Sequence, residues 1–279
     1  MNPNFAGNFL RLTDLYFQTG KDEKALSTLK RAKQQFPNDP VLTYFLARGL
    51  AQLKHYEQAL EEFGKAEKEG FLENSGQMEQ EFYFQFGAVA ERAKQYDRAE
   101  ELFRKSIARD HSFHPAYNYL GYMWIEQNKN LEEAAQLIRR AIELDENNSA
   151  YIDSIGWYYY RIGNYKQALQ HLLHAVSLAE AEAENWEIFD HIADVYLKLG
   201  QLQEAISYWK KAHALVPDND SILHKLNAHT EASAVNQTVL PPNKTESPVK
   251  VTRSNSTATS KPQKFKAAQP KPRFAPAIQ

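Results

Sequence analysis

A pair of histidines and an aspartate–serine pair are the side chains whose types and spacing could support chemistry in this chain. His171 and His174 are three residues apart, so a helix would place both imidazoles on one face, where they could share a metal ion. No carboxylate or third histidine completes a recognisable ligand set beside them. Asp153 and Ser154 could enter a catalytic triad only with a distant histidine, and nothing in the pattern fixes that geometry. We therefore expect surface or packing roles for these residues, with no bound metal and no cofactor.

The other sequence motifs that carry enzyme chemistry are absent from the 279 residues. There is no phosphate-binding loop of the form G-x-x-x-x-G-K-[ST], no dinucleotide motif G-x-G-x-x-G, no H-E-x-x-H and no G-x-S-x-G. The chain has no cysteine, which excludes disulfides, thiol nucleophiles, cysteine metal sites and a lipid-bearing cysteine. We predict that the protein is not an enzyme and that it has no small-molecule substrate.

The strongest pattern in the sequence is a recurring motif of small and large apolar residues. An alanine begins each of the six copies of this motif, and successive alanines are separated by 34, 40, 35, 34 and 37 residues. A large apolar residue follows each alanine by four positions, and another small residue follows it by seven. A period in this range predicts stacked helical units, each too small to bury its apolar face alone. The six alanines are Ala25, Ala59, Ala99, Ala134, Ala168 and Ala205.

Each alanine is preceded by a segment with apolar residues at offsets of three, four and seven, which lie on one face of a helix. A small residue such as Gly121 stands beside the central apolar position, Leu120, and permits close approach of a neighbouring helix. Short turns at Gly20, Gly163 and Gly200 separate the two helices of a unit. Glycine just after a helix end is expected to adopt the left-handed conformation.

These features resemble the tetratricopeptide repeat family, whose pattern is W-x2-L-G-x2-Y, then A-x3-F, then P. The resemblance covers roughly residues 3–220 and implies an all-α superhelical solenoid of about six helix pairs. No repeat has tryptophan at the first position, and the second repeat lacks the glycine. The steps of 40 and 37 residues predict insertions between repeats, near residues 70–76 and 181–184, rather than inside a helix pair. The expected repeats lie near residues 6–39, 40–73, 80–113, 114–148, 149–182 and 186–219.

The end of the chain differs in composition from the repeats. Residues 221–233 are expected to form a helix that caps the last repeat, so that the solenoid spans residues 3–233. Residues 234–279 hold eight basic residues, one acidic residue and seven of the twelve prolines. Such a basic segment rich in Pro, Ser and Thr cannot bury enough apolar surface to become ordered, so we expect a disordered tail. The net charge of −2 therefore divides into +7 for the tail and −9 for the rest of the chain.

A second stripe of residues on the first helices is the candidate binding site. In the tetratricopeptide family these positions line the concave groove that holds partner peptides, and aromatic residues with arginine are typical of binding hot spots. The alternative is that the aromatic side chains only fill the junctions between successive repeats. We favour the groove because Asn, Arg and Asp alternate with the aromatic residues. The candidate groove residues are Tyr44, Arg48, Phe84, Asn118, Tyr122, Asp153, Trp157, Tyr160, Asp190 and Asp194.

The charges of this stripe favour some partners over others. Family members that bind terminal carboxylates use lysine, two asparagines and further basic residues, and only Asn118 fits that set here. The carboxylates of Asp153, Asp190 and Asp194 would repel a terminal carboxylate, so a basic or mixed aromatic–basic segment suits this end better. The basic tail could also visit this acidic end and compete with partners, although a solvated spacer is its favoured role.

Three short segments narrow the resemblance to a bacterial subset of the family. N-Y-L-G-Y at residues 118–122, D-S-I-G-W at 153–157 and H-I-A-D at 191–194 are similar to the subset's signatures N-Y-L-G-Y, D-S-L-G-W and H-x-G-D. The subset includes outer-membrane lipoprotein adaptors that bring substrates to a carboxy-terminal processing protease. This chain shows no visible targeting segment, so we expect a cytoplasmic location. A bacterial periplasmic or outer-membrane location is the alternative if the natural N-terminus is longer.

The sequence thus predicts a non-enzymatic adaptor or scaffold that binds segments of partner proteins in its concave groove. Two alternatives stay open. The solenoid could be a structural subunit that packs on folded partners, a role in which the groove residues would tolerate truncation. The tail could contact nucleic acid or an anionic membrane through its charge, although no RGG or aromatic-interleaved pattern favours that contact.

Overall fold

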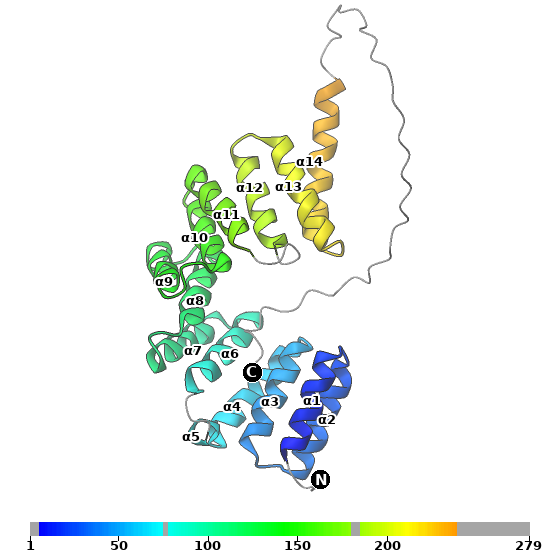
Figure 1. The fold of residues 1–279 in the computed structure, drawn as a ribbon, viewed down its shortest axis with the longest axis vertical. Coiled ribbons are helices and arrows are strands. Elements are labelled where there is room, and N and C mark those ends of the chain that lie inside the picture. Colours follow the sequence, from blue (N-terminus) through cyan, green and yellow to red (C-terminus); the bar gives the residue numbers. More distant parts are fainter. Residues whose placement is uncertain (1–5, 75–77, 180–184, 239–279) are drawn as a thin grey trace, which may run out of the picture.

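In the computed structural model, the chain is a stack of α-helices joined by short turns (Figure 1). The structure describes residues 6–74, 78–179 and 185–238, and no strand lies in these ranges. Within them, no helix is long and apolar enough to cross a membrane. The helices are α1 (Ala6–Gln18), α2 (Asp22–Gln35), α3 (Pro40–Gln52), α4 (Tyr56–Lys68), α5 (Phe71–Asn74), α6 (Glu79–Arg92), α7 (Tyr96–Arg109), α8 (His114–Glu126), α9 (Leu131–Leu144), α10 (Ser149–Arg161), α11 (Tyr165–Leu178), α12 (Trp186–Lys198), α13 (Leu202–Leu215) and α14 (Asp220–Thr238).

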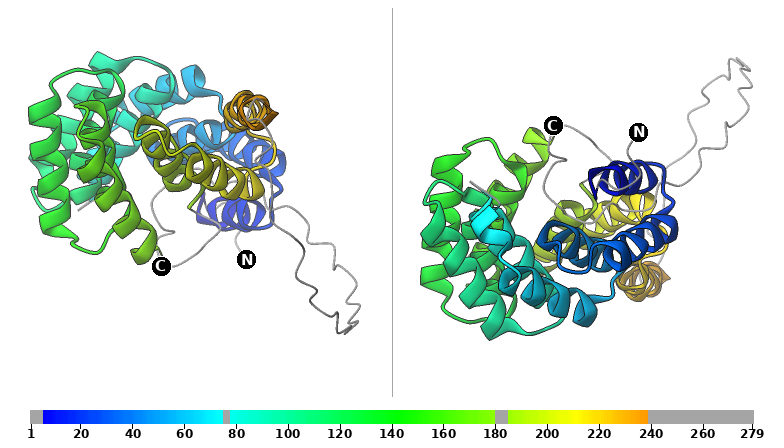
Figure 2. Two further views of the ribbon diagram at one scale, coloured as in Figure 1. Left: turned by 90° about the horizontal axis from the view of Figure 1, so that it is seen from above. Right: turned by 90° about the horizontal axis from the view of Figure 1, so that it is seen from below.

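Twelve of these helices form six antiparallel pairs, and one pair falls within each expected repeat. The pairs are α1 with α2, α3 with α4, α6 with α7, α8 with α9, α10 with α11 and α12 with α13. Helix α14 packs on α13 at the end of the stack. Seen along the long axis in Figure 2, successive pairs follow a curved path, so that the last pairs overlap the first in projection. The all-α solenoid predicted from the sequence is confirmed.

A residue in the left-handed backbone conformation follows the end of the first helix in every pair. Gly20, Gly163 and Gly200 have φ of +67°, +80° and +76°, as the glycine-containing turns predict. In the remaining three pairs the same place is taken by residues other than glycine: Lys54, Lys94 and Asn128. Because the following second helix must start at once and run back along the first, the sharp reversal is retained even where the side chain disfavours it.

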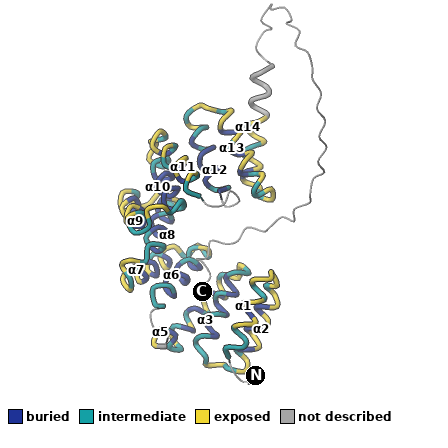
Figure 3. Tube along the Cα trace, in the orientation of Figure 1, coloured by how far each residue is buried: buried dark blue, intermediate teal, exposed yellow. Residues whose placement is uncertain are grey.

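The periodic small residues lie where helices touch. All six alanines of the repeating motif are completely buried, and Figure 3 shows the buried residues along the faces at which neighbouring helices meet. A side chain at Gly87, Gly121 or Gly156 would lie within 3.0 Å of a residue on the second helix of the same pair. Repeats two and six accept alanine at this position, at Ala47 and Ala193. Close helix contact therefore explains the small residues of both helices.

Ala168→Leu is expected to destabilise the protein by roughly 1–3 kcal/mol, because three added carbon atoms must enter a fully packed contact between α10 and α11. The loss should be confined to the fifth repeat and its neighbours, since contacts in a solenoid are mainly between adjacent repeats. Chemical denaturation combined with amide hydrogen exchange measures both effects. The matched control is Ala214→Leu at an exposed position of α13, which should change stability by less than about 0.5 kcal/mol. Equal stability of the two variants would show that Ala168 is not a packing position.

The first of the two expected insertions lies between repeats, as predicted. It forms α5, a single turn after α4, and directs Phe71 into the core. The second expected insertion, residues 181–184, lies outside the described residues and between α11 and α12 in the chain. Helix α14 continues to Thr238, five residues beyond the expected end of the capping helix at residue 233. The remainder of the expected tail, residues 239–279, lies outside the described residues.

Candidate protein-binding face

The first helices of the pairs line the inner side of the curve. Neighbouring first helices contact one another, α6 with α8, α8 with α10 and α10 with α12, whereas a second helix, outside its own pair, contacts mainly the first helix of the next pair. In a curved stack, the elements that come closest together are those on the inside of the curve. The candidate stripe, which lies on α3, α6, α8, α10 and α12, is therefore on the inner face.

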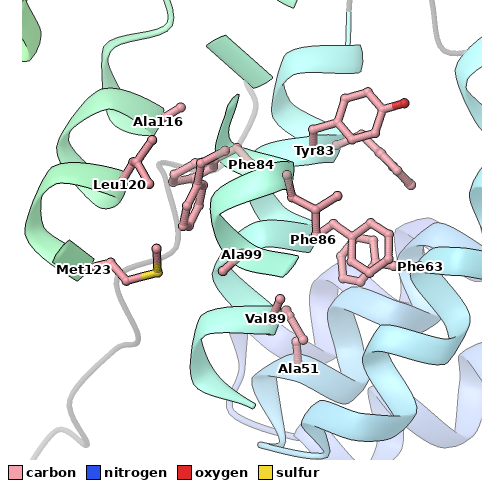
Figure 4. Close-up of a cluster of buried hydrophobic side chains, with 14 of the residues drawn as sticks. Ala51, Phe63, Tyr83, Phe84, Phe86, Val89, Ala99, Ala116, Leu120 and Met123 are labelled. Carbon is pink, nitrogen blue, oxygen red and sulfur yellow. The ribbon is translucent and has the colours of Figure 1, made fainter. Parts of the chain in front are cut away.

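Four residues of the stripe are buried in the junctions between repeats: Tyr44, Phe84, Asn118 and Asp153. The ring of Tyr44 stacks on Phe71, with ring centroids 4.4 Å apart. Figure 4 shows Phe84 between α6 and α8, near Ala116 and Leu120 of α8. This placement matches the alternative that these side chains fill the junctions, so they offer no surface to a partner.

The other six residues of the stripe retain some exposure. Tyr122, Tyr160, Asp190 and Asp194 are partly exposed, as is Arg48, and Trp157 is 8% exposed. The guanidinium of Arg48 lies 5.7 Å from the ring centroid of its neighbour Phe45, within cation–π range. The stripe therefore consists of a covered row and, further along the same helices, a partly open row.

Trp157 is held by contacts from three repeats. Its indole stacks on Tyr160 at 4.4 Å with 7° between the planes, and on His191 of α12 at 4.1 Å with 17°. The indole Nε1–H donates a hydrogen bond of 2.5 Å to Oε1 of Glu126 on α8. Tyr160 is thus the exposed end of an aromatic stack whose other members are fixed in position.

A buried ion pair lies beneath this stack. Nδ1 of His191 is 2.8 Å from Oδ1 of Asp153, and both side chains are almost completely buried. Burial lowers the pKa of His191, but the charge and the hydrogen bond of Asp153, together with the charges of Glu187 and Asp190, outweigh it, so the pKa lies above the usual value. The second carboxylate oxygen of Asp153 is buried and has no hydrogen-bond partner. Asp153 therefore joins two repeats and faces the neighbouring helix rather than the groove.

The two remaining aspartates are paired with a lysine of the last helix. Nζ of Lys225 on α14 donates to Oδ1 of Asp190 and to Oδ2 of Asp194, both at 2.8 Å. Burial raises the pKa of Asp194, and Lys225 only partly opposes this. For Lys225, the two carboxylates outweigh burial and raise its pKa. Lys225 thus balances one of the two aspartate charges at the expected acidic end, which keeps a negative excess, so a basic segment or a visiting tail at this end stays a prediction.

Three residues of this network were not predicted from the sequence: Glu126, His191 and Lys225. Lys225 lies three residues after the buried Ile222 on α14, a spacing that places it on the side of the helix facing α12 and α13. That amphipathic spacing could have predicted that Lys225 faces the preceding helices. For Glu126 and His191, no spacing in the sequence indicates a contact with Trp157.

The residues considered for metal binding or catalysis make packing and helix contacts. His171 stacks on Tyr159 of the same pair, with ring centroids 5.2 Å apart. Oγ of Ser154 donates to the carbonyl of Ala150 in its own helix, so Asp153, His191 and Ser154 do not form a triad. Within the described ranges, no three His, Asp or Glu side chains gather as a metal-binding group.

Comparison with known proteins identifies the family. A model described as tetratricopeptide repeat matches residues 75–226, and a second model of the same description matches residues 8–39. The chain belongs to the tetratricopeptide repeat family. It is 27% identical over 168 residues to the TPR repeat-containing protein PA4667 of Pseudomonas aeruginosa, covering 60% of this chain and 28% of that protein. The chain thus spans little over a quarter of that relative's length.

Solved structures share the fold. The APC/C hetero-tetramer Cut9–Hcn1 superposes with a TM-score of 0.68 at 18% identity, covering 82% of this chain and 43% of that one. Pseudomonas aeruginosa PilF superposes with a TM-score of 0.59 at 17% identity, covering 82% of this chain and 97% of that one. At these identities the likeness establishes the solenoid architecture alone.

Proposed function

We propose that this tetratricopeptide protein is a non-enzymatic adaptor that holds a segment of a partner protein against its inner face, over α8, α10 and α12. The observation that carries the proposal is the pair of partly exposed tyrosines, Tyr122 and Tyr160, on the first helices of adjacent repeats. Tyrosine and tryptophan are among the side chains that most often dominate binding energy at protein interfaces. Membership of the family supports a protein partner, because its members generally mediate protein–protein interactions.

The chemistry of the partner segment follows from the charges around these tyrosines. Lys225 pairs with Asp190 and Asp194 and balances one of their two charges. Glu126 accepts the Trp157 hydrogen bond and lies 4.0 Å from Arg161. The face therefore offers rings and hydroxyl groups, with a negative excess at Asp190 and Asp194. We favour a segment whose apolar or aromatic side chains pack on the tyrosines and that carries a basic residue toward the two aspartates.

Truncating the two tyrosines should weaken partner binding without unfolding the protein. The double variant Tyr122→Ala, Tyr160→Ala is expected to lose at least about tenfold in affinity, since each hot-spot residue contributes more than about 1 kcal/mol. Affinity is measured by titration of a partner recovered with the wild-type chain. Thermal melting of each variant verifies that the solenoid is intact.

The matched control is Tyr96→Ala. Tyr96 is a 38% exposed tyrosine at the start of α7, a second helix, and therefore lies away from the inner face. The Tyr96→Ala variant should bind the partner with wild-type affinity. If instead the Tyr122, Tyr160 double variant binds normally, the inner face is not the binding site, and a structural subunit that packs on folded partners becomes the better account.

A narrower role is supported by the three signature segments. Residues 153–157 and 191–194 contain Asp153, Trp157 and His191 of the network that joins repeats four to six. Together with the bacterial relative, this resemblance leads us to propose a bacterial adaptor that delivers substrates to a carboxy-terminal processing protease. Faster cleavage of a substrate by such a protease when the purified chain is added would support this role, and an unchanged rate would contradict it.

A further inference from the structure

We propose that His191 is a positioning residue whose protonated ring holds Trp157 and Tyr160 in place, so that this part of the inner face is well formed only while the ring carries its proton. The importance of that face rests on the proposed function. The geometry of the ring stack does not depend on it and is tested without a partner.

The contacts form a continuous path from the core to the surface. Asp153 of α10 is completely buried and fixes the His191 ring through the 2.8 Å contact with Nδ1. The His191 ring lies against Trp157, and Trp157 lies against Tyr160, with ring centroids 4.1 and 4.4 Å apart. His191 is the member of this path that comes from another repeat, so it connects α12 to the aromatic residues of α10.

The charges around His191 favour its protonated form. Asp153 faces the ring from α10, and Glu187, Asp190 and Asp194 act on it from its own helix α12. Lys225 of α14 is bound to Asp190 and Asp194 and offsets one of their two charges. Asp153 differs from Asp190 and Asp194 in that its ion-pair contact is with His191 and not with Lys225.

The direction of the pH effect follows from the raised pKa. Burial by itself lowers the pKa of His191, and the charge and hydrogen bond of Asp153, together with the charges of Glu187 and Asp190, raise it by more. A histidine whose pKa is raised in the folded state stabilises the fold. This stabilisation is fully present below the unfolded-state pKa of about 6.5, and it is lost as the pH rises through the folded-state pKa. Above that point the buried carboxylate of Asp153 lacks a counter-charge, and Trp157 loses the attraction between its ring and the imidazolium. The stack should therefore loosen as the solution becomes alkaline.

The experiment is an NMR titration of the full chain with labelled histidine and tryptophan side chains. His191→Gln assigns the histidine signal, and Trp157→Phe assigns the indole Nε1–H signal. We expect His191 to titrate with a midpoint above about 6.5, and the Trp157 signal to shift with the same midpoint. In His191→Gln the indole signal should show no such step.

Asp153→Asn is the discriminating variant, because asparagine keeps nearly the same shape and removes the charge. Burial is then opposed only by the smaller effects of Glu187 and Asp190, so the His191 midpoint should fall below that of the wild-type chain. An unchanged midpoint would show that Asp153 does not set the charge state of the ring, and would contradict the proposal. The proposal is overturned if wild-type His191 titrates at or below the ordinary value, or if the Trp157 signal does not follow it. If Asp153→Asn does not fold, the shared midpoint in the wild-type chain decides by itself. Because no partner is present, these outcomes are independent of whether Tyr122 and Tyr160 bind one.

Discussion

Gly121→Ala is expected to destabilise the protein by about 3 kcal/mol, although it adds a single methyl group. A Cβ at this position would lie 2.8 Å from the backbone oxygen of Ala134 and 2.8 Å from Cγ1 of Ile138. A side chain can rotate away from such a contact, but the carbonyl can move only if α9 moves with it. The two helices of the fourth repeat would have to separate, and the contacts of α8 with α6 and α10 would be strained.

The matched control is Gly64→Ala on α4, where nothing lies within 4 Å of the added Cβ. Alanine is the better helix former, so this variant should be more stable than the wild type by about 0.5–1 kcal/mol. Urea denaturation of the two variants gives opposite signs if close helix contact is the reason for Gly121. A stabilising effect of Gly121→Ala would show that the pairs are less tightly packed than described above.

Phe71→Ala should have the second large effect, a loss of about 3–5 kcal/mol. Phe71 belongs to the insertion between repeats two and three and is almost fully buried. Its ring stacks on Tyr44 at 4.4 Å and on Phe82 at 5.2 Å, so its removal leaves a cavity between α3 and α6. The insertion is thus a packing element of the core and not a spacer.

Two comparisons make the Phe71 prediction specific. Phe71→Leu should lose less than half as much stability, because leucine refills most of the cavity. Leu15→Ala on α1, where the side chain is 53% exposed, should change stability by less than about 0.5 kcal/mol. If Phe71→Ala melts at the wild-type temperature, the insertion does not support the junction.

The fold was predictable because its determinants recur. The six alanines and the glycines beside them are small for one physical reason, helix contact, and that reason applies in every repeat. Repetition therefore reveals the pairing even where one repeat, such as the second, departs from the pattern. Features that occur once, such as the inward direction of Phe71, leave no periodic signal.

The candidate site was only partly predictable. Periodicity fixes which side of a helix points inward, but it does not fix how closely the next repeat covers that side. Tyr44 and Phe84 are covered, whereas Tyr122 and Tyr160, further along their helices, are partly exposed. The partner of Asp190 is 35 residues away on α14, and this contact depends on how α14 lies on the last pair rather than on the repeat.

Site-specific photo-crosslinking tests the central claim most directly. A benzoylphenylalanine is introduced at Tyr122 on the inner face, at Tyr96 on a second helix, or at Leu15 on the exposed edge of α1, and the protein is irradiated with its partner. We predict crosslinks to one continuous partner segment from position 122 and none from position 96 or 15. Crosslinks from position 15 or 96 without any from position 122 would contradict an adaptor that binds through its inner face.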